Sequence, residues 1–376
     1  MSLALVVTVV LVALAFEYIN GFHDTANSIA TVVATKVLTP IQAVALAAVT
    51  NLLGALWGTA VARTIAAGLV DSNLVTLTPQ IMICALLGAV VWNLITWWWG
   101  LPSSSSHALI GGLCGAALAS AHNSPTAIIW WESAVHWWQG RGVIPKVILP
   151  MVVSPVAGFV LGFTIMGLLF ALLATLGDRG PLAPFMRPRH VNRVFARMQM
   201  LSSSVMGFSH GMNDAQKTMG IIALALASAT TAGSLDRIPE WLGFLRVAER
   251  AHHEFTIPIW IKVVCALVMA SGTLVGGWRI VKTLGHKIVK LRPVNGVAAD
   301  IACSTVILTA SHLGIPVSTT HNVSAAIMGV GAAKRSNAVR WHIVERMIWA
   351  WILTLPVTAG IAWLLVEVLH GLGWSG

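Results

Sequence analysis

Long apolar segments separated by short polar loops run along the whole chain. Apolar stretches cover residues 2–19, 41–62, 81–99, 145–176, 258–280 and 343–369, with shorter pieces at 107–121, 218–233, 296–311 and 322–333. A helix needs about 20 predominantly apolar residues to cross the hydrocarbon core of a bilayer. The pattern therefore predicts an all-α polytopic membrane protein.

A basic segment at residues 177–197 divides the chain into two parts. It holds five arginines and three prolines, and short loops rich in Lys and Arg stay on the cytoplasmic side of a membrane. We therefore expect a first membrane half at 1–176, a basic cytoplasmic linker at 177–197 and a second membrane half at 198–376. The basic loops at 282–292 and 334–346 should be cytoplasmic as well.

Residues 296–333 lie between those last two loops and hold two apolar pieces that we judge too short to span. They predict a re-entrant helical hairpin with Pro316 near its tip, which is tolerated where protein or a cavity shields the broken backbone. In the first half 81–121 takes the corresponding place, although 81–99 is long enough to span. Each half then crosses an odd number of times, so the halves are inverted in the cell (inner) membrane with both termini outside.

Composition supports a membrane protein and excludes other classes. The 376 residues are 57% hydrophobic and 10% charged, against about 25% charged in a soluble domain. The formal net charge is +10, but the bases cluster in short loops, so we expect membrane lipid and no nucleic acid as a partner. The four cysteines lie inside apolar segments without ligand spacing and are predicted to be packing residues.

Two different motifs occur twice, in the same order. "GFHDTAN" (residues 21–27) matches "GMNDAQK" (211–217), which aligns Asp24 with Asp214. "GLPSSSSHALIGG" (100–112) matches "GIPVSTTHNVSAA" (314–326). Duplicated motifs in inverted halves are typical of a secondary transporter whose site lies at the repeat interface.

The hydroxyl residues after each proline predict an anion site. Proline breaks the incoming helix, and hydroxyls then stand at the first turn of the next helix, where unpaired N–H groups and the helix dipole favour negative charge. The candidates are Ser104, Ser105, Ser106, Ser318, Thr319 and Thr320. Alternatively, these hydroxyls only cap the helix or bond back to carbonyls.

Asp24 and Asp214 lie inside apolar crossings, where an ionised carboxylate is costly unless it is paired. Asn27 and Asn213 supply neutral oxygens beside them, which hard cations prefer. Neighbouring glycines, Gly21 among them, predict a broken helix that holds a cation or a proton. Alternatively, each aspartate caps a kink, or Asp214 pairs with Lys217.

Other polar residues leave weaker hypotheses. Asp300 could join the site or cap a helix, and Glu17 could join the site or reach the membrane surface. Four histidines, His23, His107, His210 and His321, would suit a divalent metal-ion transporter, but no pair of them has i,i+4 spacing. We expect neither a bound metal nor catalytic residues, since Ser106 and His107 are adjacent and point to different faces of a helix.

These duplicated motifs resemble those of the PiT family of inorganic phosphate transporters, over nearly the whole chain. The resemblance implies import of inorganic phosphate, free or as a metal complex, by symport with sodium or protons, in a homodimer without a cofactor. It places phosphate on the six hydroxyl residues and the coupling cation on Asp24, Asn27, Asn213 and Asp214. A sulfate permease belongs to the same family, so the oxyanion stays open.

His23 favours the proton as the coupling cation. The first motif has His23 where the second has Asn213, and an unperturbed imidazole titrates near pH 6.5, where about half is protonated. Beside Asp24 it could pass a proton to or from the carboxylate. Alternatively, His23 only bonds a backbone carbonyl at a helix break, and sodium is the coupling ion.

Overall fold

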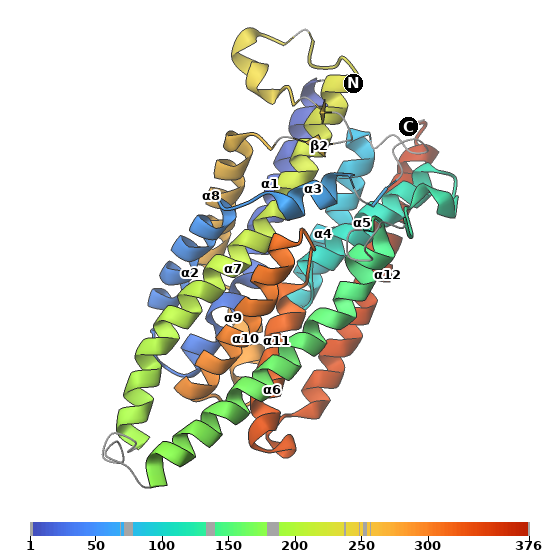
Figure 1. The fold of residues 1–376 in the computed structure, drawn as a ribbon. Coiled ribbons are helices and arrows are strands. Elements are labelled where there is room, and N and C mark those ends of the chain that lie inside the picture. The colour runs from blue at the N-terminus through green and yellow to red at the C-terminus, as the bar shows by residue number, and fades with distance from the viewer. Residues whose placement is uncertain are drawn as a thin grey trace.

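The computed structural model describes residues 3–67, 69–70, 78–132, 140–178, 188–236, 238–247, 249–250, 254–255 and 257–374. These residues form an elongated bundle of helices (Figure 1), so the predicted all-α class is confirmed. Both termini lie at one end of the bundle, and the end of helix α6 and the start of helix α7 lie at the other.

The bundle is built from twelve α-helices in the described part of the chain. In chain order they are α1 Leu3–Ala34, α2 Pro40–Ala55, α3 Ala60–Ala67, α4 Pro79–Trp99, α5 Ser105–Ser120, α6 Leu149–Asp178, α7 Pro188–Thr231, α8 Ile259–Val275, α9 Trp278–Lys282, α10 Pro293–His312, α11 Thr319–Lys334 and α12 Trp341–Gly371. Short 3₁₀ helices η1 Pro125–Ala127, η5 Glu240–Leu245 and η8 Ser336–Ala338 and short π-helices η3 Ile144–Ile148 and η7 Thr283–Lys287 complete the described helical elements. Strands β1 Glu249–Arg250 and β2 Glu254–Phe255 pair antiparallel.

Several helices are long and apolar enough to cross a bilayer. Among the described residues they are α1, α4, α10, α12 and the continuous stretch Ile144–Leu176, and a sixth arises if α8 and its bent continuation Trp278–Lys287 form one span. The bend between those two helices is 59°. The protein is therefore a multi-pass membrane protein.

Two predicted crossings are interrupted where hydropathy gives no signal. The segment 41–62 divides into α2 and α3, and 258–280 divides into α8 and α9. The expectation that both pieces of 296–333 are too short to span is wrong for α10, which begins at Pro293 and has 20 residues. The apolar run counted from residue 296 left out Asn295, which is buried inside the bundle together with Asp300, Ser304 and Ser311.

The helix breaks predicted at the two aspartate motifs are wrong. Helix α1 and helix α7 run without interruption through these motifs. Their glycines serve close packing instead, because a Cβ on Gly21 would lie 2.4 Å from the Met269 carbonyl oxygen and one on Gly211 would lie 2.1 Å from that of Asn51. The absent side chains thus let α8 and α2 approach the backbones of α1 and α7.

The breaks occur in the two helical hairpins. Helices α4 and α5 are joined through Pro102, and α10 and α11 are joined through Pro316. Gly100 and Gly314 end the first helix of each pair with φ of 64° and 66°, a left-handed conformation that glycine adopts without strain. The hairpins come from opposite ends of the bundle, so their broken tips face its middle (Figure 1).

Candidate functional site

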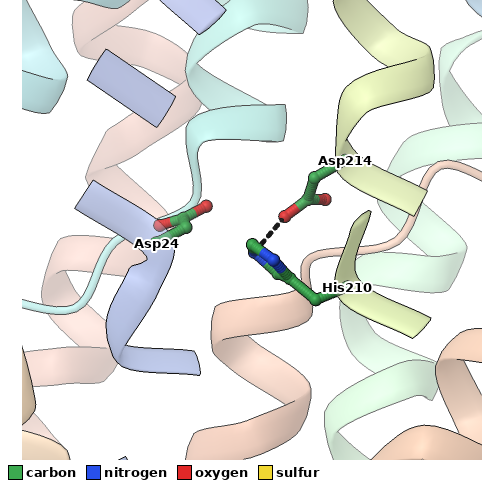
Figure 2. Close-up of side chains that lie close together, drawn as sticks. All are labelled: Asp24, His210 and Asp214. Carbon is green, nitrogen blue, oxygen red and sulfur yellow. Dashed lines mark ion pairs between the residues drawn. The ribbon is translucent and has the colours of Figure 1, made fainter. Parts of the chain in front are cut away.

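The predicted site residues are all buried in the middle of the bundle. Each is at most 3% exposed: His23, Asp24, Asn27, Ser104, Ser105, Ser106, Asn213, Asp214, Ser318, Thr319 and Thr320. They come from α1, α7 and the first turns of α5 and α11 with their N-caps. Figure 2 shows Asp24 on α1 facing His210 and Asp214 on α7. The fold thus brings both aspartates and both hydroxyl clusters together.

Two of the six hydroxyl residues act as helix caps. The Ser104 Oγ accepts a hydrogen bond from the His107 backbone N–H, and the Ser318 Oγ accepts one from that of His321, both at 3.2 Å. A hydroxyl that accepts at a cap still has its own proton to donate. The capping alternative therefore holds for these two residues and leaves their O–H groups available.

The next hydroxyl in each hairpin donates to an aspartate. Ser105 Oγ lies 2.7 Å from Asp24 Oδ2, and Thr319 Oγ1 lies 2.8 Å from Asp214 Oδ2. Thr320 Oγ1 makes a longer contact of 3.4 Å to Asp24 Oδ1. The same relation between hydroxyl and carboxylate therefore occurs in both halves, as the duplicated motifs predict.

Asp214 is surrounded by basic groups from its own helix. Its Oδ2 lies 2.9 Å from His210 Nε2, the ion pair dashed in Figure 2, and its Oδ1 accepts from the Lys217 ammonium. Lys217 also donates to Ser106 Oγ and, over 3.2 Å, to the Val317 carbonyl. Of the two alternatives for Asp214, pairing with Lys217 is the one that the structure contains.

Asp24 has a different set of partners. Its Oδ1 lies 2.6 Å from His23 Nδ1, and the other ring nitrogen, Nε2, lies 3.1 Å from Thr96 Oγ1 on α4. Within the described part of the chain, no Lys or Arg forms an ion pair with Asp24. His23 thus contacts the carboxylate directly and bridges it to α4, rather than bonding a backbone carbonyl at a helix break.

The two asparagines of the motifs are oriented by different elements. Asn27 Nδ2 donates to Thr319 Oγ1 at 3.2 Å and to Thr320 Oγ1 at 2.9 Å, which ties α1 to the tip of α11. Asn213 Nδ2 donates to Ser311 Oγ on α10 at 2.9 Å. Each side-chain oxygen is buried without a hydrogen-bond partner among the described residues. Such oxygens are available to a cation.

His210 is named above only as a possible metal-ion ligand, and its contact with Asp214 was not predicted. One ligand atom each from Asp24, His210 and Asp214 lie within 4.8 Å of one another, a group in which a metal or other cation can be held (Figure 2). The signal was present, because His210 precedes Asp214 by four residues and therefore shares its helix face. The i,i+4 spacing that no pair of the four histidines has is therefore the spacing between His210 and Asp214.

Two further carboxylates are buried away from this cluster. Glu17 on α1 is 0% exposed and accepts from Thr218 on α7, so it does not reach the membrane surface. Asp300 accepts from Thr31 at 2.8 Å, Ser202 at 2.9 Å and Ser203 at 2.8 Å. The capping alternative for Asp300 is wrong, because it lies in the interior of α10.

The histidines that follow the two hydroxyl clusters meet each other. The rings of His107 and His321 lie 4.9 Å apart, centroid to centroid, and His321 stacks on Trp351 at 4.2 Å. None of the four ring nitrogens has a partner among the residues that the structure describes. Since these histidines occupy matching positions of the two motifs, their contact places the motifs face to face.

Fold and site together define a polytopic membrane protein with one buried polar centre shared by two similar halves. Residues 20–362 match the phosphate transporter family. Proteins described as probable low-affinity inorganic phosphate transporters are similar throughout. That of Bacillus subtilis (strain 168) is 41% identical over 98% of both chains, and that of Rhizobium meliloti (strain 1021) is 42% identical over 96% of both.

A solved structure described as "The sodium-dependent phosphate transporter" has the same fold. It superposes with a TM-score of 0.77 over 98% of this chain and 99% of that chain, at 24% sequence identity. The chain belongs to the phosphate transporter family, and the resemblance to PiT transporters is confirmed. This is a family of transporters, not of enzymes.

Proposed function

We propose that this chain imports inorganic phosphate across the cell (inner) membrane by symport with protons. The observation that carries this proposal is the shared cluster of hydroxyl donors and buried aspartates between two hairpin tips. The oxyanion fits the hydroxyls and free N–H groups of the helix starts. The names of the relatives support phosphate as the substrate.

The hydrogen bonds of the cluster give a mechanism for coupling. Ser105 and Thr319 donate to Asp24 and Asp214, so these O–H groups are not free to bind an anion. A cation or proton that neutralises Asp24 weakens its hold on Ser105 and removes its repulsion of the anion. Phosphate then binds the released Ser105 hydroxyl, and the two ligands favour each other's binding.

Charge balance explains why such coupling is needed. An inside-negative potential of about 100 mV opposes each negative charge that moves inward by about 2.3 kcal/mol, so a phosphate dianion meets about 4.6 kcal/mol. Each monovalent cation carried inward with the anion offsets about 2.3 kcal/mol of this work. No cofactor is required for this scheme, only the coupling ion.

The proton is favoured by the geometry of His23. Its Nδ1 lies 2.6 Å from the Asp24 carboxylate and its Nε2 lies 3.1 Å from the Thr96 hydroxyl. The contact with Thr96 orients the ring, so that Nδ1 can exchange a proton with Asp24. The alternative is sodium, for which Asp24 and the free Asn27 oxygen would serve as ligands. Asn213 and Asp214 complete the predicted coupling residues.

A second candidate substrate is a complex of phosphate with a divalent metal. It is favoured by the group of Asp24, His210 and Asp214, whose ligand atoms lie within 4.8 Å of one another. Transport of a bare divalent metal is disfavoured, because the Lys217 ammonium bonded to Asp214 repels a cation whose charge no phosphate offsets. Sulfate remains the alternative oxyanion, since the same donors would bind it.

We further propose that the segments 1–176 and 198–376 are inverted repeats joined by the linker 177–197. Matching close contacts between helices support this. Helix α2 meets α7 where a Cβ on Gly54 would lie 2.0 Å from the Phe208 carbonyl oxygen, and α8 meets α1 where a Cβ on Gly272 would lie 2.2 Å from the Tyr18 carbonyl oxygen.

Phe208 and Tyr18 stand at equal distances before the two motif aspartates, so the repeated contact matches the repeated sequence. Both termini lie at the end of the bundle opposite to the end of α6 and the start of α7 (Figure 1), as expected for termini outside and a cytoplasmic linker. The homodimer stays a prediction.

The anion site is tested by removing one donor from each hairpin. In proteoliposomes, Ser105→Ala combined with Thr319→Ala should raise the KM for radiolabelled phosphate at least about tenfold, because each lost donor is worth about 1–3 kcal/mol in a dry site. Parallel arms with sulfate and with phosphate plus Mg²⁺ identify the transported species. The matched control is Ser271→Ala with Thr309→Ala, whose exposed hydroxyls bond only within their own helices. Unchanged phosphate uptake in the folded double variant would refute this anion site.

A further inference from the structure

The two halves of the site differ at one position that carries charge. Asp24 and Asp214 align in the duplicated motif, and the residue three positions later is Asn27 in the first half but Lys217 in the second. Both helices are continuous here, so these two residues lie one turn beyond their aspartates. Equivalent places therefore hold a neutral amide in one half and an ammonium in the other.

The Lys217 ammonium is held as a metal ion would be held, by oxygen atoms alone. It is 2% exposed and donates to the Asp214 carboxylate, the Ser106 hydroxyl and the Val317 carbonyl. An ammonium has three N–H donors, and these three acceptors use all of them. Asp214 is thus neutralised by a cation that is attached to the chain and cannot leave.

The first half offers the corresponding oxygens without an attached cation. Asn27 contacts Thr320 at 2.9 Å, and Thr320 is the counterpart of the Ser106 that Lys217 contacts. The Asn27 Oδ1 is buried and has no partner within the described chain. Asp24 has His23 beside it on α1, while the basic groups on α7, His210 and Lys217, bond to Asp214.

We propose that Lys217 permanently fills, in the second half, the position that a mobile coupling cation takes at Asp24 in the first half. The transporter then loads one mobile monovalent cation per cycle, and the second positive charge of the site is built in. This inference rests on the proposed cation-coupled transport. It concerns the number and place of the mobile cations, and it holds for a proton and for sodium.

The test measures charge moved per phosphate, from currents and radiolabel flux recorded together in proteoliposomes. Lys217→Asn gives the second half the residue of the first, so a second mobile cation should take the place of the ammonium at Asp214. This variant should therefore move one more positive charge per phosphate than the wild type. Asn27→Lys places an attached ammonium in both halves and should move one fewer. Lys217→Arg keeps an attached cation and should leave the ratio unchanged. Differences between variants are independent of the protonation state of phosphate.

An active Lys217→Asn or Asn27→Lys variant with the wild-type ratio would overturn the inference. If neither variant folds, as judged by size-exclusion chromatography, the cation dependence of wild-type uptake still tests the inference. Its uptake should depend on the driving cation with a Hill coefficient of one, and a coefficient of two would refute a single mobile cation. Wild-type protein that moves no phosphate would instead refute the proposed function.

Discussion

Asp24→Asn is expected to abolish gradient-driven phosphate uptake while leaving the protein folded. The carboxamide has nearly the shape of the carboxylate and its oxygen still accepts from Ser105, but it takes up no proton and has no negative charge to balance a coupling cation. Uptake under a cation gradient should fall by about 100-fold, the upper range of typical coupling between two ligands.

The measurement is initial uptake of radiolabelled phosphate by proteoliposomes that contain equal amounts of folded protein. Glu345→Gln on the exposed face of α12 is the matched control, since it removes a carboxylate that lies outside the site. Gradient-driven uptake by Asp24→Asn at the wild-type rate would exclude Asp24 as the coupling carboxylate.

Asp214→Asn should act differently, by destabilising the protein. It removes the charged partner of the buried Lys217, and a buried ion pair that loses one member typically costs about 3–5 kcal/mol. Asp24 has no Lys or Arg ion-pair partner in the described chain, so Asp24→Asn should not carry this penalty. The expected result is a much lower melting temperature and yield for Asp214→Asn than for Asp24→Asn.

The double variant Asp214→Asn, Lys217→Asn provides the decisive comparison. It removes both charges together, and a buried pair replaced as a whole is often nearly neutral for stability. Its melting temperature in detergent should therefore return close to that of the wild type. Equal stability of the two single aspartate variants would show that Lys217 does not depend on Asp214 in the fold.

The duplicated motifs carried most of the information about the site. Because each motif occurs once per half, the sequence alone predicted that Asp24, Asp214 and the hydroxyls after Pro102 and Pro316 would meet. Their hydrogen bonds in the structure agree with that prediction. The reason is physical, since apolar helices can bury such groups only against one another.

Contacts between distant helices set the features that sequence reasoning missed. Gly21 was interpreted as a point of unwinding, but it faces Met269 on α8, a partner almost 250 residues away that no local pattern reveals. The bend of 59° after α8 lies at Gly276 and Gly277, inside the segment 258–280 that was interpreted as one crossing. Asp300 shows the same limit, because its three hydroxyl donors come from α1 and α7.

The central claim, proton-coupled phosphate import, is tested most directly with the wild-type protein in sodium-free proteoliposomes. An inward proton gradient should drive accumulation of radiolabelled phosphate, and a protonophore should collapse it. Uptake that requires an inward sodium gradient and ignores the protonophore would contradict the claim and make Asp24 and Asn27 sodium ligands.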